Sequence, residues 1–444
     1  MLVKKINKVY WIIGVLLYLF FAYNNIGTRE QLYFYIYSFV AFFIFGITIH
    51  ESFKRNRFYF TKQNLTISVL LVSLIQVIIL SLLSYSIDGD LFLFSKIDSM
   101  IYYDNSLKMS KMSFSEGIYY VSHKFSFDDW GAFIWFSTLF RISESLFFIK
   151  LVHVIIGVIS SLMIFDIGCY LMPRRYAYMA SLTFCIASFT AVLHVAFLKE
   201  TIFTFLIISA FYAFYRFLHR KNILYLIVVF FLSALVAIFR LPVALILIFA
   251  FVMTLIVMYT KRLLTVVLGV VFSVIMITSS YFALTYERYL RAGNVEEIIE
   301  RKEELSMGGG FVNHIADPLA AFIGPFPSIA VKNISKTSLY APSLLYRVLL
   351  AAPFFLGAFY IVRYKKKELY PLVLFFMINA IGVAISVKGL EYRITHPHLA
   401  MAYIVAFWWL AQYDYKRLPL RLPSNAINVC FLIVFALSLI WNLR

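Results

Sequence analysis

The residues best suited to chemistry in this chain open a polar, aromatic segment that follows the third long apolar run. Asp98 is followed four residues later by Tyr102 and six residues later by Asp104. At helical spacing Asp98 and Tyr102 share a face, and Asp104 lies within about two turns. A carboxylate at a membrane–water boundary can act as a general base toward an alcohol when burial or neighbours tune it. The alternative is that both aspartates are solvated loop charges.

The composition indicates that a membrane protein carries these residues. Hydrophobic residues make up 62% of the 444 residues, charged residues 14%, and the mean hydropathy is +0.86. Repeated apolar runs of about 17–25 residues, bounded by charge, are typical of transmembrane helices. The three cysteines fall inside apolar runs and indicate neither a disulfide framework nor a metal cluster. We therefore expect an all-α polytopic membrane protein with about 13 transmembrane helices.

The apolar runs divide the chain into five expected segments. Residues 1–86 form an N-terminal three-helix transmembrane segment whose first two spans are expected to be a lipid-facing appendage. Residues 87–146 form an extracytoplasmic segment, residues 147–285 a transmembrane core, residues 286–342 a second extracytoplasmic segment, and residues 343–444 the last transmembrane helices. The expected spans are 9–25, 31–50, 65–86, 147–171, 176–197, 200–217, 222–239, 241–259, 263–285, 343–362, 370–387, 397–411 and 425–442.

The formal net charge of +18 is distributed unevenly along this expected topology. With the N-terminus in the cytoplasm, every short inner link is basic, as in KRNR at 54–57 and RYKKK at 363–367, whereas the outer segments are nearly balanced. The positive-inside rule accounts for such an excess, so no nucleic-acid partner is needed. We expect a bacterial plasma-membrane protein, without a cleavable signal, whose site is extracytoplasmic.

The first extracytoplasmic segment is expected to contain interfacial helices, because residues 96–125 mix apolar and polar positions at helical spacing. Asp128 and Asp129 follow them and can ligate a divalent cation, bind sugar hydroxyls, or cap the next helix. Asp166, within the fourth span, is expected to pair with Arg174 or Arg175 in a structural role.

Two very short links place further charges at the outer boundary. Lys199 and Glu200 lie between the fifth and sixth spans, where such a pair is costly unless it binds something or finds another partner. Arg240 precedes Leu241 and Pro242, and a proline near the first turn starts a helix comfortably. The Arg240 guanidinium can hold a phosphate group with two hydrogen bonds, or it can extend to lipid headgroups.

The later outer links hold weaker candidates. In the second extracytoplasmic segment we expect an amphipathic helix at 296–305 and a glycine hinge at 308–310. The last link contains Arg393, His396 and His398. Two histidines in a His-X-His arrangement can bind zinc, but no further ligand follows nearby, so neither a metal nor another cofactor is predicted.

Together these residues resemble those of integral-membrane GT-C glycosyltransferases, especially the bacterial branch similar to protein mannosyltransferases and aminoarabinose transferases (glycosyltransferase family 39). The resemblance covers about residues 90–410. Two features depart from the family pattern: two additional spans precede the acidic loop, and no large C-terminal soluble domain is evident. The residues that carry the resemblance are Asp98 with Tyr102, Glu200 in a short external turn, Arg240 with Pro242, and Arg393 with Pro397.

The resemblance implies a GT-C-like fold and sugar transfer from a polyprenyl-phosphate-linked donor to a cell-envelope glycan, lipid or protein acceptor. Asp98, with Asp104 as the second candidate, would be the catalytic base. Arg240, Arg393 and Lys199 would hold the donor phosphate. The implied substrate contacts are Tyr102, Asp128, Asp129, Glu200, His396 and His398.

Two other functions remain open. An O-antigen or capsular polysaccharide polymerase uses similar polyprenyl-linked substrates but joins whole repeat units. A lipid-linked oligosaccharide flippase or another transporter should place ionisable residues near the bilayer midplane, often on broken helices in paired repeats. Most ionisable residues of this sequence are expected at the outer boundary and no internal repeat is apparent, so the sequence favours an enzyme.

Overall fold

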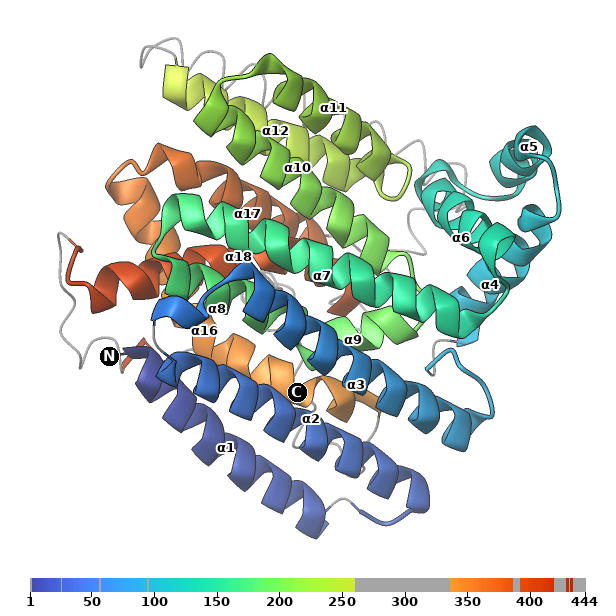
Figure 1. Cartoon of the computed structure of the whole chain (residues 1–444), viewed down its shortest axis with the longest axis horizontal. Coiled ribbons are helices and arrows are strands. Elements are labelled where there is room, and N and C mark those ends of the chain that lie inside the picture. Colours follow the sequence, from blue (N-terminus) through green and yellow to red (C-terminus); the bar gives the residue numbers. More distant parts are fainter. Residues whose placement is uncertain are drawn as a thin grey trace.

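The computed structural model describes residues 2–24, 26–55, 57–93, 96–259, 336–385 and 392–418, together with 429–430 and 432–433. Every regular element in these ranges is a helix, and most of the long helices lie along one common direction (Figure 1). The predicted amphipathic helix at 296–305, the glycine hinge at 308–310 and the span at 263–285 lie outside these ranges, as does nearly all of the span at 425–442.

Six helices in the described ranges are long and apolar enough to cross a membrane. A bent pair, α8 (Arg174–Cys185) and α9 (Ser188–Val195), makes a seventh if it counts as one span. An α-helical polytopic membrane protein is thus confirmed at this level, whereas the full number of spans stays a prediction. The six are α2 (Arg29–Lys54), α3 (Lys62–Asp88), α7 (Leu146–Leu171), α10 (Glu200–Arg220), α12 (Leu241–Tyr259) and Ser338–Arg363, which includes α16 (Ala341–Arg363).

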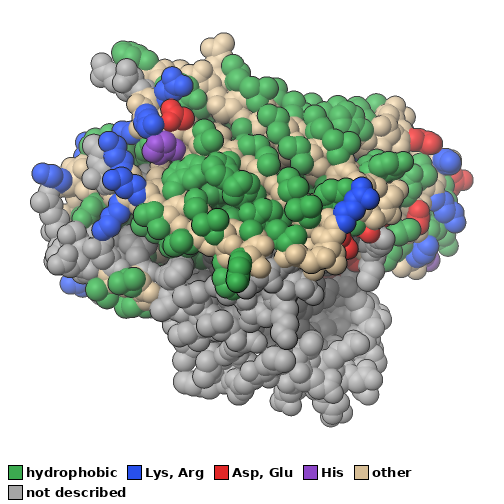
Figure 2. Space-filling view, turned by 90° about the horizontal axis from the view of Figure 1, so that it is seen from below, with side chains coloured by type: hydrophobic (Ala, Val, Ile, Leu, Met, Phe, Trp, Pro, Cys, Tyr) green, Lys and Arg blue, Asp and Glu red, His purple; other side chains and the backbone are tan. Residues whose placement is uncertain are grey.

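The two ends of the bundle differ in charge. In Figure 2 mostly Lys and Arg side chains gather at the end that holds the N-terminus, whereas Asp and Glu are mixed with Lys and Arg at the other end. On the face that Figure 2 shows, hydrophobic side chains cover much of the described surface between the two ends. An apolar band between polar ends is the surface that a bilayer solvates.

Short helices form the end that carries the acidic residues (Figure 1). They are α4 (Lys96–Ser110), α5 (Phe114–Lys124), the 3₁₀ turn η2 (Phe127–Asp129) and α6 (Trp130–Ile142). Ser113 and Glu116 form a capping box that starts α5. Aromatic packing attaches the segment to the bundle: the Phe136 ring on α6 stacks 4.0 Å from the ring of Phe197, in the link between α9 and α10.

The expectation that the first two spans are a lipid-facing appendage holds only for their outer faces, where Leu16 and Leu19 are exposed; their inner faces pack against the core. Helix α1 (Leu2–Asn24) places Tyr10 against the Tyr346 ring of α16, with centroids 5.6 Å apart. On α2, the Ser38 hydroxyl donates to the backbone oxygen of Ser338 at 2.6 Å. These partners lie some 300 residues away in sequence, and an apolar, aromatic surface does not reveal whether it faces lipid or protein.

The predicted span at 176–197 is a broken helix rather than a straight one. Helices α8 and α9 meet at an angle of 45°. Side chains satisfy the backbone groups freed at the break: Gln76 donates to the Ile186 carbonyl at 3.2 Å, and Thr190 donates to the Phe184 carbonyl at 2.8 Å. A broken helix is tolerated inside a membrane when such partners are supplied.

Asp166 has different partners from those the sequence suggested. Its carboxylate lies 2.7 Å from Lys62 Nζ and 3.7 Å from Arg216 Nη2, rather than pairing with Arg174 or Arg175. These ion pairs join α3, α7 and α10 near the basic end, as the expected structural role would require. The sequence could not reveal partners on neighbouring helices that approach Asp166 only in the folded chain.

Candidate functional site

Tyr102, Asp129 and Lys199, here called the Asp129 cluster, bring together α4, the η2–α6 junction and the start of α10. The Tyr102 hydroxyl donates to Asp129 Oδ1 at 3.0 Å, and Lys199 Nζ donates to the same oxygen at 2.5 Å. The three residues lie far apart in the sequence but were all predicted site residues. The fold therefore collects at one point what the sequence placed on separate links.

The Lys199 ammonium group is fully used by the protein. Besides Asp129, it donates to the backbone oxygens of Asp128 at 2.8 Å and Phe239 at 3.0 Å. An ammonium group has three donors, and three protein oxygens accept them here. Lys199 thus ties α6 to the turn between α11 (Ile223–Ala237) and α12. This arrangement favours a structural role for Lys199 over the predicted contact with a donor phosphate.

Burial and charge shift the pKa values of Lys199 and Tyr102 in the cluster. Burial lowers the pKa of Lys199, the negative charge of Asp129 opposes that shift, and the positive charge of Arg240 adds to it. Burial raises the pKa of Tyr102, and the negative charges of Asp129, Glu200 and Asp98 raise it further. The Tyr102 hydroxyl therefore stays protonated and keeps donating to Asp129.

Arg240 lies beside the cluster, immediately before α12. Its guanidinium is 5.7 Å from the centre of the Phe203 ring, and the residue is half-buried. Within the described part of the chain the guanidinium forms no ion pair. A half-buried arginine near a helix N-terminus offers both positive charge and planar donors to an anionic group.

Glu200, the first residue of α10, is only 3% exposed. One of its carboxylate oxygens, Oε2, is buried and accepts no hydrogen bond from any described residue. The Glu200 charge nevertheless acts on Tyr102 and Lys199, which places it beside the cluster. A buried carboxylate oxygen without a donor is costly, and such atoms call for a specific explanation.

The remaining predicted aspartates differ in position. Asp98 is half-buried in the first turn of α4, and its charge reaches Tyr102, whereas Asp104 is exposed. The Asp128 carboxylate accepts a hydrogen bond from Ser126 at 2.7 Å. Asp129 occupies the N-cap position of α6 but makes no capping bond, because its carboxylate turns to the cluster instead.

The two predicted histidines lie in the helical core, outside the Asp129 cluster. On α18 (Tyr392–Asp414), the His396 ring stacks on Phe184 at 4.9 Å, and His398 packs edge-on against Phe376 at 5.1 Å. The Arg393 side chain lies outside the described residues. In the described ranges no group of three or more His, Cys, Asp or Glu residues could hold a metal ion.

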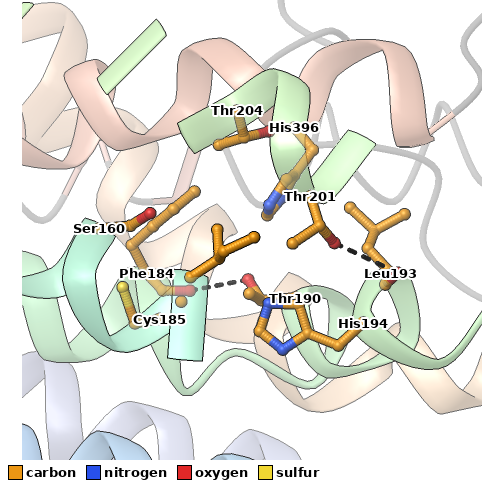
Figure 3. A pocket seen from close by; sticks show the side chains of 11 residues that line it. Ser160, Phe184, Cys185, Thr190, Leu193, His194, Thr201, Thr204 and His396 are labelled. Atoms are coloured by element: carbon orange, nitrogen blue, oxygen red, sulfur yellow. Dashed lines mark hydrogen bonds between the residues drawn. The ribbon is translucent and has the colours of Figure 1, made fainter. Parts of the chain in front are cut away.

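A small chamber lined by both polar and apolar side chains lies at the break between α8 and α9. Figure 3 shows the His194 and His396 rings extending toward it from opposite sides. Helix α10 contributes Thr201 and Thr204, and α8 contributes Cys185. The chamber, here called the His194 chamber, is large enough for a water molecule.

Sequence reasoning missed several buried ionisable residues of the described core, among them Arg347 and His153. Arg347 on α16 is 2% exposed and donates to the Thr395 hydroxyl at 3.3 Å. His153 on α7 is fully buried, with its Nδ1 3.2 Å from the His194 backbone oxygen. Both sit inside apolar runs, and a charged or titratable residue in such a run is itself the signal that should have flagged them.

Fold and site together define the class of this chain as an α-helical polytopic membrane protein with a buried charged cluster at one end of its bundle. No family model matches the chain, and neither the curated proteins nor the solved structures searched contain a match.

Proposed function

We propose that this protein is an integral-membrane glycosyltransferase that moves a sugar from a polyprenyl-phosphate-linked donor to an acceptor hydroxyl. The observation that carries the proposal is the position of Arg240 beside the Asp129 cluster. Lys199 binds the Phe239 carbonyl directly before Arg240, so the cluster fixes the backbone that presents the guanidinium. A fixed, half-buried cation beside several carboxylates offers separate contacts to a phosphate and to hydroxyl groups.

The reaction needs two functions at this point. The acceptor oxygen forms a bond to the anomeric carbon of the sugar while the bond from that carbon to the phosphate oxygen breaks. Asp98, on the face of α4 that also carries Tyr102, would take the acceptor proton. Arg240 would stabilise the charge that develops on the departing polyprenyl phosphate, which keeps the electron pair of the broken bond.

The test replaces Arg240 with Lys and with Ala. Transfer of radiolabelled sugar from a polyprenyl-phosphate donor is measured with purified protein, together with donor affinity. We expect Arg240→Lys to lower donor affinity and turnover despite the retained charge, because the planar pair of donors is lost, and Arg240→Ala to lower them more. Removal of a charge-assisted hydrogen bond costs about 1.5–3 kcal/mol, which corresponds to roughly 10–150-fold in affinity.

Arg220→Lys is the matched control. Arg220 is an exposed arginine in the last turn of α10, whereas the Asp129 cluster and Arg240 lie near the first turn of that helix. It should leave transfer unchanged. If Arg240→Lys retains full donor affinity and turnover, Arg240 is an interfacial anchor and the proposal loses its main support. A polymerase would be recognised in the same assay by products that grow by whole repeat units.

The broken helix supports a second candidate, a transporter of lipid-linked glycans. The break between α8 and α9 lies next to buried His194, and transporters often place titratable residues on such broken helices. In liposomes a transporter would move the lipid-linked glycan to the other leaflet chemically unchanged, whereas a transferase would convert it to a product of different mass. Mass spectrometry of the recovered lipid therefore decides between the two.

A further inference from the structure

Three buried polar atoms near the start of α10 have no hydrogen-bond partner among the described residues. They are Nδ1 of His194, Oε2 of Glu200 and Oγ1 of Thr204. The three residues are 3%, 3% and 4% exposed. Desolvated polar atoms without partners destabilise a folded protein by about 1–3 kcal/mol each, so their presence in one region points to a ligand that supplies the missing partners.

Two of the three residues share one chamber, and the third lies one helical turn away. His194 and Thr204 both line the His194 chamber. Glu200 precedes Thr204 by four residues on α10, so the two side chains lie on the same face of that helix, one turn apart. Glu200 itself lies outside the chamber lining, one turn from Thr204 on α10, and its charge acts on Lys199 of the Asp129 cluster.

The hydroxyl groups of the other two threonines at the chamber already donate to backbone carbonyls. The unpartnered atoms of His194, Glu200 and Thr204 therefore define which ligand groups the region can bind. Thr190 donates to the Phe184 carbonyl at 2.8 Å, and Thr201 donates to the Leu193 carbonyl at 3.3 Å, as Figure 3 shows. A carboxylate oxygen accepts only, whereas a threonine hydroxyl both donates and accepts, and an imidazole nitrogen does one or the other according to its tautomer. Neighbouring hydroxyl groups, each a donor and an acceptor, match this set.

We propose that the face of α10 from Glu200 to Thr204, together with His194, binds hydroxyl groups of a carbohydrate. This inference deepens the proposed function, since the ligand would be the sugar of the donor or the acceptor. In the present conformation the chamber admits only a water-sized group, so sugar binding requires that the α8–α9 break and α10 separate. Cys185 lines the same chamber and reports that opening.

The experiment measures labelling of Cys185 by methyl methanethiosulfonate in purified protein, with Cys169 and Cys430 replaced by Ala. Mannose, glucose and galactose are the probes, and betaine is the osmolyte control without hydroxyl groups. We expect at least one of the three sugars to slow labelling. Thr204→Val and Glu200→Gln should raise the half-protecting sugar concentration about tenfold, the effect of one lost hydrogen bond of about 1.4 kcal/mol.

Thr183→Val is the matched control. Thr183 is also a buried threonine whose hydroxyl has no described partner, but it does not line the chamber. Its variant should keep full protection. Thr204→Val should not lower the thermal unfolding midpoint, because it removes a desolvated hydroxyl that no described group satisfies, whereas loss of a structural water bridge would lower that midpoint.

Each outcome decides the proposal. It is overturned if Cys185 never reacts in the folded protein, if no sugar protects it, or if Thr183→Val and Thr204→Val behave alike; the chamber then holds structural water only. Protection without any transfer from a lipid-linked donor would leave the carbohydrate site standing and remove the transferase. Sugar transfer without protection of Cys185 would leave the transferase standing and remove the carbohydrate site.

Discussion

Lys199 is the residue on which the charged cluster depends. Its ammonium group joins the Asp129 carboxylate, the Asp128 carbonyl and the Phe239 carbonyl, and its side chain is 8% exposed. Loss of the ammonium group would remove one donor from each of these three acceptors, and Asp129 would keep the Tyr102 hydroxyl as a donor. The cluster therefore holds the backbone before Arg240 as well as the carboxylate of Asp129.

We expect Lys199→Met to destabilise the protein by about 3 kcal/mol, at the low end of the range for breaking a buried ion pair, because Asp129 is 27% exposed and regains some water. Lys62→Met is the control. The side chain of Lys62 is 52% exposed, so its ion pair with Asp166 should be worth at most about 1 kcal/mol. Denaturant unfolding in mixed micelles measures both. Equal effects would show that the buried pair contributes no more than the exposed one.

Among the helices, α6 and the turn between α11 and α12 form the contact that positions the site. The Gly131 amide donates to the Ile238 carbonyl at 2.9 Å. A Cβ at Gly131 would lie 2.5 Å from the Phe239 ring, so only glycine permits this approach. The contact connects the short helices α4 to α6 to the turn that carries Arg240.

Gly131→Ala should therefore push α6 away from this turn. We expect a destabilisation of about 1–3 kcal/mol, as for overpacking of a filled core, together with weaker binding of the polyprenyl-phosphate donor. Gly27→Ala is the control, because a Cβ at Gly27 meets only the Gln31 side chain at an ordinary 3.5 Å. The thermal unfolding midpoint in detergent measures stability. A Gly131→Ala protein as stable as Gly27→Ala would show that Phe239 moves aside at little cost.

The whole molecule is organised by the charge difference between its two ends. Basic residues gather at the end that holds the N-terminus, whereas the short helices α4 to α6 and the Asp129 cluster occupy the other end (Figures 1 and 2). By the positive-inside rule the basic end should face the cytoplasm. The Asp129 cluster would then face the extracytoplasmic side.

A topology measurement tests this orientation. A reporter inserted after Lys366 should give a cytoplasmic signal, and one inserted after Lys124, at the end of α5, should give an extracytoplasmic signal. Paired green fluorescent protein and alkaline phosphatase fusions at each point make the measurement. If both points report the same side, the antiparallel arrangement fails; if the sides are exchanged, the Asp129 cluster faces the cytoplasm.

Much of this arrangement could be read from the sequence. Apolar length and bounding charge located helices at nearly every predicted span within the described ranges. Antiparallel neighbours place alternate links at the same end, which is why Tyr102, Asp129, Lys199 and Arg240 could be assigned to one region before their contacts were known. The short links at Lys199 and Arg240 left these residues little freedom to lie elsewhere.

Only the tertiary structure decided which groups meet. Asp129 pairs with Lys199, 70 residues away in the sequence, and Asp166 pairs with Lys62, 104 residues away. Gln76 donates a hydrogen bond to the Ile186 carbonyl at the helix break. In a water-soluble helix the apolar stripe identifies the packed face, but in a bilayer lipid and protein favour equally apolar surfaces. The sequence of a membrane helix therefore specifies that the helix spans the bilayer. Its neighbours are specified by small-residue packing and interhelical hydrogen bonds, which form only after folding.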